Sequence, residues 1–138
     1  MKKVQIFCLM AIMLALGISC EKKRSGEPKV LVFSKTMGFR HASILAGISA
    51  IRELGATHGF TVDATENAES FTEENLEQYS AVIFLSTTGD VLNAPQEGAF
   101  ERYIQSGGGY VGVHAATDTE YDWGWYGKLA GAYFESHP

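Results

Sequence analysis

Short apolar runs alternate with amphipathic stretches along most of this chain. Continuous runs at residues 30–33, 81–85 and 110–113 are rich in β-branched and aromatic residues, a pattern typical of strands buried on both faces of a sheet. Residues 60–65 form a weaker run of the same kind. Between these strands the pattern predicts helices, whose expected N-terminal residues are Ser43, Thr72 and Asn93.

Strands and helices that alternate in this way predict a doubly wound α/β fold of the flavodoxin-like kind, with a mainly parallel sheet and helices on both faces. Ligands bind such sheets at the carboxyl ends of the strands, close to the point where the strand order reverses. Three polar loops follow predicted strands, at residues 35–41, 86–90 and 114–118. We therefore expect one functional site where these loops converge.

Composition narrows the class of protein further. The chain has 138 residues, of which 46% are hydrophobic, so it fits a single packed domain. Asp and Glu number 16 against 11 Lys and Arg. This acidic balance argues against a nucleic-acid partner, because binding nucleic acid requires a basic surface.

The start of the chain differs in character from the rest. Two lysines precede an apolar run at residues 4–18, which is the pattern of an export signal and is too short for a spanning helix. Because small residues lead up to Cys20, we expect residues 1–19 to be a lipoprotein-type signal peptide, Cys20 to be lipidated and residues 20–28 to be a tether. An ordinary secretory peptide with an incidental cysteine is the alternative.

These expectations place the protein outside the cytoplasm. A lipid anchor would hold residues 29–138, the predicted α/β domain, at the membrane of the cell envelope, facing the periplasm or the exterior. Cys8 lies in the segment that export would remove, and Cys20 would carry the lipid. No thiol would then remain for catalysis or for a disulfide.

His114 is the leading candidate for catalysis. It directly follows the predicted strand at residues 110–113, where related α/β enzymes carry a nucleophile on a sharp turn. An imidazole there can act as a general base or a metal ligand, but it does not suit acyl-enzyme chemistry. Asp118 is close enough in sequence to orient His114 or to bind a sugar hydroxyl. The alternatives are a buried histidine bonded to the backbone and an exposed loop acid.

His41 follows the first predicted strand, and its loop should face His114. The two histidines could share proton transfer in catalysis or hold a divalent metal such as zinc, with His137 as a third ligand. The sequence has no HExxH-like spacing to support a metal. A capping or solvated loop residue is the alternative for His41.

Substrate-binding residues are expected in two places. Thr87, Thr88 and Asp90 lie in the polar loop that follows the predicted strand at residues 81–85. Trp123 and Tyr126 lie in an aromatic-rich loop close to polar groups, so their rings suit stacking on a sugar. Packing of these rings in the core is the alternative.

The sequence resembles the ThuA-like, or trehalose-utilisation, family in three segments, GFRHASI at residues 38–44, LSTTGDVLN at residues 85–93 and GGGYVGVHAATDTEYDWGWYGKLAGAYFESHP at residues 107–138. The resemblance implies a fold similar to class I glutamine amidotransferases and a role in carbohydrate metabolism, with glucosides, trehalose-like disaccharides or keto-sugars as ligands. The amidotransferase cysteine is replaced by His114, which argues against glutamine hydrolysis. Family domains usually continue past the final His-Pro, so we expect a C-terminally truncated member that lacks its last strands and helices.

Two functions remain open. The first is a sugar-active hydrolase or lyase without a cysteine nucleophile, in which His114, His41 and Asp118 act on the substrate. The second is a non-catalytic carbohydrate-binding or accessory module of the envelope. A protein-interaction role of the acidic surface is a weaker third possibility.

Overall fold

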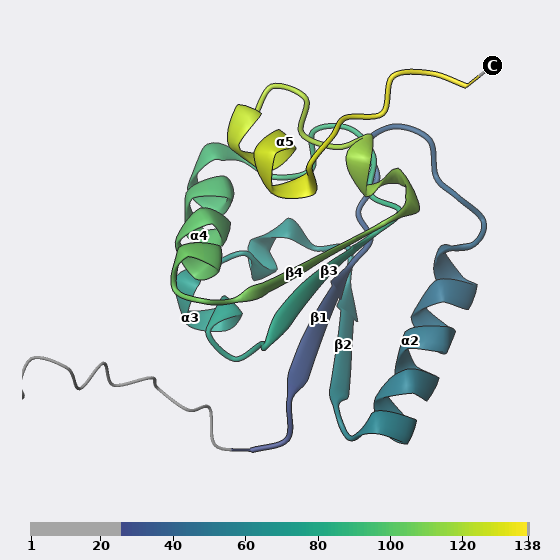
Figure 1. The fold of residues 1–138 in the computed structure, drawn as a ribbon, viewed down its shortest axis with the longest axis vertical. Helices are drawn as coiled ribbons and strands as arrows, with labels where there is room; N and C mark the ends of the chain where they lie inside the picture. Colours follow the sequence, from purple (N-terminus) through teal and green to yellow (C-terminus); the bar gives the residue numbers. More distant parts are fainter. Residues whose placement is uncertain (1–25, 138) are drawn as a thin grey trace, which may run out of the picture.

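The fold is built on a four-stranded parallel sheet. The computed structural model describes residues 26–137, so the expected signal peptide and Cys20 lie outside the described part. The strands lie in the order β2-β1-β3-β4 (Figure 1). They are β1 (Lys29–Phe33), β2 (Thr61–Thr65), β3 (Ala81–Leu85) and β4 (Gly109–Val113). The strand order reverses between β1 and β3, which confirms the doubly wound α/β fold expected from the sequence.

Helices cover both faces of the sheet. On one face lies α2 (Ile44–His58), and on the other lie α3 (Glu73–Leu76), α4 (Ala94–Gln105) and α5 (Gly124–Ala130) (Figure 1). Two single-turn 3-10 helices are η1 (Ala68–Ser70) and η2 (His114–Thr117). Within residues 26–137, none of the helices has the length and apolar character needed to cross a membrane.

Local sequence explains where the helices begin. Asn93 and Gln96 exchange side-chain to backbone hydrogen bonds at the start of α4, forming the capping box that the sequence predicts. Thr72 caps α3 by accepting a hydrogen bond from Asn75 N–H. Ser43 precedes α2 as expected, but it makes no side-chain cap because its backbone is already helical, with φ −71° and ψ −11°.

One helix end and one further helix are decided by the structure. Helix α2 passes through Gly55 and ends before Gly59, whose left-handed φ of 71° suits a glycine. Gly55 is required inside the helix because a Cβ there would lie 2.5 Å from the carbonyl oxygen of Phe60. The further helix is α5, which forms where the sequence predicts only a loop.

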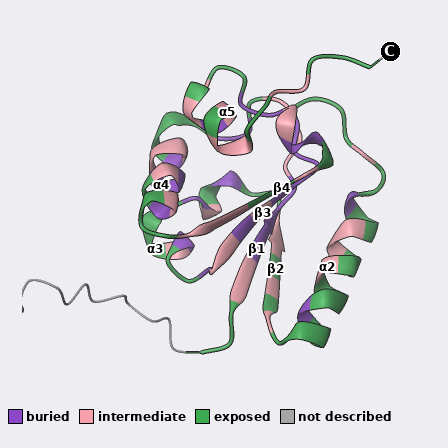
Figure 2. Cartoon of the chain, viewed as in Figure 1, coloured by how far each residue is buried: buried purple, intermediate pink, exposed green. Residues whose placement is uncertain are grey.

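Aromatic side chains dominate the core between the sheet and α3, α4 and α5. Phe33, Phe71, Phe84 and Phe100 are all buried, and their neighbouring ring centroids lie 4.6–5.8 Å apart, mostly edge to face. Figure 2 shows this buried layer on the inner sides of the strands and helices. Aromatic pairs in this geometry contribute about 0.5–1.5 kcal/mol each beyond the burial of area, so the core holds the strand ends firmly.

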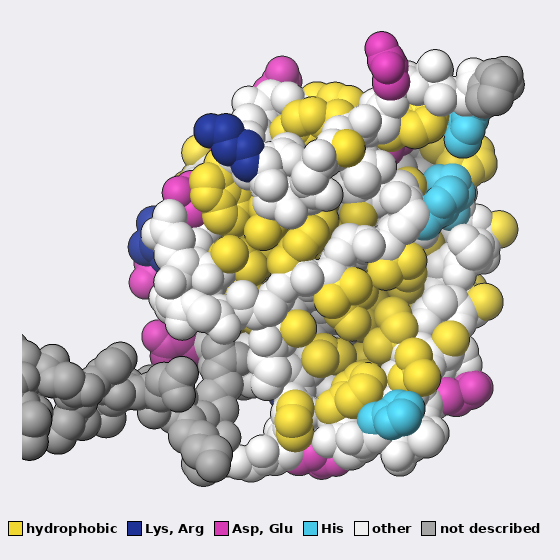
Figure 3. Space-filling model, viewed as in Figure 1, with side chains coloured by type: hydrophobic (Ala, Val, Ile, Leu, Met, Phe, Trp, Pro, Cys, Tyr) yellow, Lys and Arg dark blue, Asp and Glu magenta, His cyan; other side chains and the backbone are white. Residues whose placement is uncertain are grey.

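The sheet face toward α2 is less covered near β4. β4 is an edge strand, and Val111 in its centre is 45% exposed. Leu45 and Leu54 on α2 are also exposed, and Figure 3 shows hydrophobic side chains gathered on the surface on this side of the molecule. Open strand edges and apolar surfaces of this kind are features through which sheets associate with further polypeptide.

Candidate functional site

Three loops meet at the carboxyl ends of β1, β3 and β4, as the sequence predicts. The loop after β1 pairs with the loop after β3 through Thr36 and Thr88, and the latter loop pairs with the segment after η2 through Gly89 and Thr119. In addition, Gly89 N–H donates to the carbonyl oxygen of Asp118 at 2.8 Å. Backbone pairing therefore continues from the sheet into the loops that carry the candidate residues.

His114 lies at the end of β4, on the first residue of η2. Its φ of 54° is left-handed, a strained conformation for a residue with a Cβ, and sharp strand-to-helix turns of this kind present a side chain at the edge of a sheet. The residue is exposed, which excludes a buried strand-end histidine. The His41 ring contacts it edge to face, with ring centroids 4.4 Å apart and an interplanar angle of 70°.

The histidine pair borders a pocket of about 150 Å³. Phe134 lines another side of it, and Phe134 N–H donates to the carbonyl oxygen of Thr117 at 2.9 Å. This bond brings the C-terminal segment across η2, and Figure 3 shows histidine side chains close together on the surface near the C-terminus. The pocket gathers the residues predicted for catalysis or metal binding, namely His41, His114, Asp118 and His137.

Asp118 has a different partner from the expected one. The Tyr121 hydroxyl lies 2.7 Å from both Asp118 Oδ1 and the carbonyl oxygen of Phe134. Loss of hydration and the hydrogen bond to Asp118 raise the pKa of Tyr121 to about 12, so the phenol stays protonated and donates. Among residues 26–137, no hydrogen bond joins Asp118 to His114.

The metal prediction can be compared with the spacing of the donor atoms. His41, His114 and His137 line the same pocket, but within the described residues they do not form a set whose donor atoms all lie within 4.8 Å of one another. Zinc sites in proteins take three or four protein ligands. A three-histidine site would require these side chains to move closer together.

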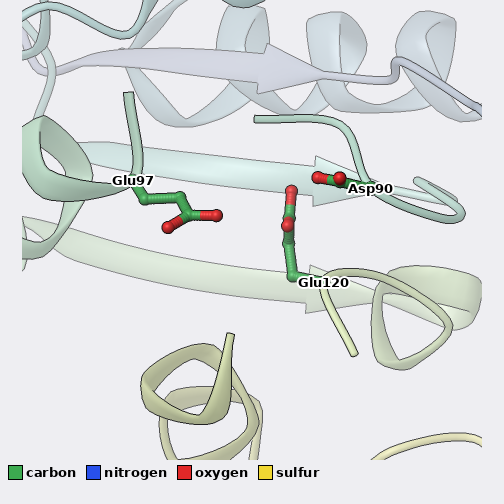
Figure 4. Close-up of side chains that lie close together, drawn as sticks. All are labelled: Asp90, Glu97 and Glu120. Atoms are coloured by element: carbon green, nitrogen blue, oxygen red, sulfur yellow. The ribbon is translucent and has the colours of Figure 1, made fainter. Parts of the chain in front are cut away.

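Three carboxyl groups converge where the same loops meet α4. They belong to Asp90, Glu97 and Glu120, whose oxygens lie within 4.8 Å of one another (Figure 4). Glu120 is only 2% exposed, and its Oε1 accepts the N–H groups of Val91 at 3.0 Å and Leu92 at 2.8 Å. Exposed acidic groups at such a spacing are common without an ion. Because Glu120 is bonded to the backbone, we assign this cluster a structural role.

Burial is the main cause of a raised pKa at Glu120. Loss of hydration raises the pKa of Glu120 to about 7, and the nearby charges of Asp90 and Glu97 act in the same direction, whereas the two backbone N–H groups oppose them. Sequence analysis predicted Asp90 as a substrate-binding residue but overlooked Glu120. No local pattern marks Glu120 as buried, because its partners lie about 30 positions away.

The threonines predicted to bind substrate instead hold the loops together. Thr87 and Thr88 are fully buried. Thr87 Oγ1 lies 2.9 Å from Thr119 Oγ1, and Thr88 Oγ1 donates to the carbonyl oxygen of Phe39 at 3.0 Å. Their hydroxyl groups therefore contact other loop residues inside the protein.

The two rings predicted to stack on a sugar lie against the core. Tyr126 is 0% exposed, and its hydroxyl donates to the carbonyl oxygen of Ala116 at 2.8 Å. Trp123 is half-buried and stacks on Trp125 with ring centroids 5.0 Å apart. Helix α5 packs the Tyr126 ring onto Phe84. As a result, Tyr126 has no exposed face on which a sugar could stack.

A different ring lies exposed beside the histidine pair. Phe39 is 70% exposed, and its ring centroid lies 4.9 Å from that of His41. Its backbone is held by the hydrogen bond from Thr88, whereas its side chain is open to solvent. The available sequence signal was its position two residues before His41, in the loop after the first strand.

Comparison with known proteins agrees with this architecture. The family model ThuA, described as trehalose utilisation, matches residues 29–138. The crystal structure of a ThuA-like protein from Bacteroides uniformis is similar with a TM-score of 0.66 and 25% sequence identity, covering 88% of this chain and 52% of that one. The chain thus spans about half the length of that protein. No curated protein matches the chain.

Proposed function

Because the chain belongs to the ThuA (trehalose utilisation) family, we propose that it binds and acts on a carbohydrate in the pocket beside His41 and His114. The family description supports a carbohydrate as the substrate class. The observation that carries the proposal is the contact between the two imidazoles, which come from the ends of β1 and β4 and border one pocket. This is the edge of the sheet at which doubly wound folds bind their ligands.

Two adjacent imidazoles suit acid–base chemistry on hydroxyl and carbonyl groups. A neutral ring can accept a proton from a sugar hydroxyl or from a carbon next to a carbonyl, while a protonated ring can donate to a leaving oxygen. The contact between the two rings places a possible proton acceptor and a possible proton donor side by side in one pocket, as a hydrolase or lyase requires.

The position of His114 also limits the reaction. The left-handed turn after β4 presents an imidazole where related α/β enzymes present a serine or cysteine nucleophile. We therefore propose a sugar-active hydrolase or lyase that works without a cysteine nucleophile, and not a glutamine amidotransferase. His114 would be the general base, or a metal ligand if a divalent ion such as zinc binds with His41.

The volume of the pocket favours a small ligand. The pocket holds about 150 Å³, below the roughly 300–1,000 Å³ of pockets that enclose drug-sized molecules. One ring of a glucoside, a trehalose-like disaccharide or a keto-sugar would fit this size, with Phe39 beside His41 as the stacking surface. Aromatic faces bind the apolar faces of sugar rings, and Phe39 exposes such a face.

A non-catalytic carbohydrate-binding module is the second candidate. The observation in its favour is that Asp118 bonds to Tyr121, so within the described residues no carboxylate orients His114 as in a catalytic triad. In this case the pocket would bind a sugar, and removal of the imidazole would not change any turnover.

The test uses the full-length protein with trehalose, a simple glucoside and a keto-glucoside as probes. We expect His114→Ala to reduce product formation, followed by NMR, at least about 100-fold while circular dichroism stays unchanged. His58→Ala is the matched control, because His58 is exposed at the far end of the 15-residue α2, about 20 Å along the helix. Binding without turnover, lost in Phe39→Ala, would favour the binding module. Absence of both binding and turnover with all three probes would refute the carbohydrate site.

We also propose that the protein is exported and anchored to the cell envelope through a lipid on Cys20. The charged start, the apolar run at residues 4–18 and the small residues before Cys20 support this location. Cys20→Ala should move the protein from the membrane fraction to the soluble fraction, and Cys8→Ala should not. Retention of the Cys20→Ala protein in the membrane fraction would exclude this anchor.

A further inference from the structure

Glu120 adds side-chain bonds between the loop after β3 and the segment after η2, next to the backbone bridge of Gly89 and Thr119. Its backbone N–H donates to the carbonyl oxygen of Gly89 at 3.2 Å, and its side-chain Oε1 accepts the N–H groups of Val91 and Leu92. One residue thus holds both ends of the short segment from Gly89 to Leu92. Removal of the side-chain contacts would free the Val91 and Leu92 end of this loop, while Gly89 would stay bonded to Asp118.

The same connection reaches the pocket. Gly89 N–H donates to the carbonyl oxygen of Asp118, and Gly89 pairs with Thr119. Asp118 lines the pocket beside His114. Glu120 is therefore a positioning residue for Asp118, because it acts on that residue through the paired backbone and does not itself line the pocket.

The carboxyl group of Glu120 is placed where a negative charge is unfavourable. It is 2% exposed, and the carboxylates of Asp90, from the loop after β3, and Glu97, from the first turn of α4, point toward it (Figure 4). Like charges at this spacing repel, and burial weakens their screening by water. The pKa of Glu97 is itself raised, first by burial and then by Asp90.

The other polar groups around Glu120 do not neutralise this charge. Lys35 Nζ donates to the carbonyl oxygen of Val91 at 2.8 Å, so this cation is bonded to the loop backbone. The Tyr133 hydroxyl donates to the backbone oxygen of Glu120 at 2.9 Å. Burial raises the pKa of Tyr126 on α5, which keeps its phenol neutral.

We propose that the Glu120 side chain is a proton-operated latch, which holds the loop after β3 against the segment carrying Asp118 while its carboxyl is protonated and loosens that contact when it ionises. The protonated carboxyl accepts the two N–H groups without placing a third negative charge in the cluster. Ionisation favours an open loop in which the carboxylate gains hydration and moves away from Asp90 and Glu97. Any effect on sugar binding rests on the proposed function, whereas the latch itself does not.

The test measures the loop directly and needs no sugar. Hydrogen exchange of the Val91 and Leu92 amides is followed by NMR in the full chain from pH 5 to pH 8, corrected for intrinsic exchange rates. With a pKa of about 7 in the closed form and an ordinary glutamate value in the open form, protection should fall at least about tenfold over this range. Glu120→Gln keeps an acceptor oxygen and cannot ionise, so its protection should not change with pH.

Two further variants complete the design. Glu97→Gln removes one of the charges that raise the pKa of Glu120, so the loss of protection should end at lower pH and have a smaller amplitude than in wild type. Glu53→Gln, on an exposed position of α2, should behave as wild type. The proposal is overturned if wild-type protection is independent of pH, or if Glu120→Gln shows the same pH dependence as wild type. Either result would leave the carbohydrate proposal intact, which distinguishes the two failures.

Discussion

The substitution Gly55→Ala tests how closely helix α2 packs against the turn that leads into β2. Helix α2 follows the loop that carries His41, and Gly55 packs α2 against the turn that leads into β2. Alanine is favoured over glycine by about 1 kcal/mol in a helix interior, so propensity alone predicts a more stable protein. The structure predicts the opposite sign for Gly55→Ala.

The magnitude follows from the contacts that the new methyl group would make. A Cβ at position 55 would lie 2.5 Å from the carbonyl oxygen of Phe60, and 3.2 Å from carbons of the Phe60 and Val62 side chains. The backbone there is held, since Gly59 and Phe60 both donate N–H groups to the Gly55 oxygen. Overpacking of this kind costs about 1–3 kcal/mol, so the net loss is up to about 2 kcal/mol after the propensity gain.

Gly98→Ala in α4 is the matched control. Its Cβ would meet Arg102 Nη1 at 3.2 Å, the far end of a flexible side chain that can move aside. This variant should therefore be more stable than wild type by up to about 1 kcal/mol. Urea denaturation followed by circular dichroism measures the free energy of unfolding of both variants. If Gly55→Ala were as stable as Gly98→Ala, the proposed close contact between α2 and the Phe60 carbonyl would be wrong.

Three further outcomes are expected. Tyr126→Phe leaves the carbonyl oxygen of Ala116 without its donor and should reduce the free energy of unfolding by about 1–2 kcal/mol in urea denaturation; no loss would mean that water replaces the hydroxyl. The raised pKa of Glu120 means that its proton stabilises the fold fully below about pH 4.5, and that this stability is lost as the pH rises through about 7. Glu120→Gln should therefore gain stability relative to wild type between pH 5 and pH 8, by up to about 3 kcal/mol, and an equal difference at both pH values would contradict this reasoning. Phe39→Ala removes an exposed ring, so its melting temperature should match wild type within a few degrees, and a large drop would show that the ring supports the fold.

The fold could be predicted from the chain because its strongest signals are local. The continuous run at residues 81–85 forms β3 over the same residues, since apolar β-branched and aromatic side chains suit a strand covered on both sides. Asn93 and Gln96 mark the start of α4 through bonds within one turn. Strands and helices alternate along the chain, and crossover connections between parallel strands are almost always right-handed. Few topologies are therefore compatible with the sequence.

The candidate site could be predicted only in part. His41, His114 and Asp118 were expected together because each follows a strand of one parallel sheet, and the carboxyl ends of those strands share an edge. The roles of Tyr126 and Thr87 were not predictable in this way. A tyrosine near polar residues has the same local pattern in a binding site and in a core, and α5 determines which applies here.

The strands, the caps of α3 and α4 and the succession of strands and helices were thus inherent in the order of residues, since each depends on periodicity or on hydrogen bonds between near neighbours. Burial of Glu120, exposure of Phe39 and the contact between His41 and His114 depend on contacts between segments far apart in the chain. Only the folded molecule brings those segments together. The pKa of a carboxyl group changes with its hydration and neighbouring charges, so the protonation of Glu120 was likewise decided by tertiary structure.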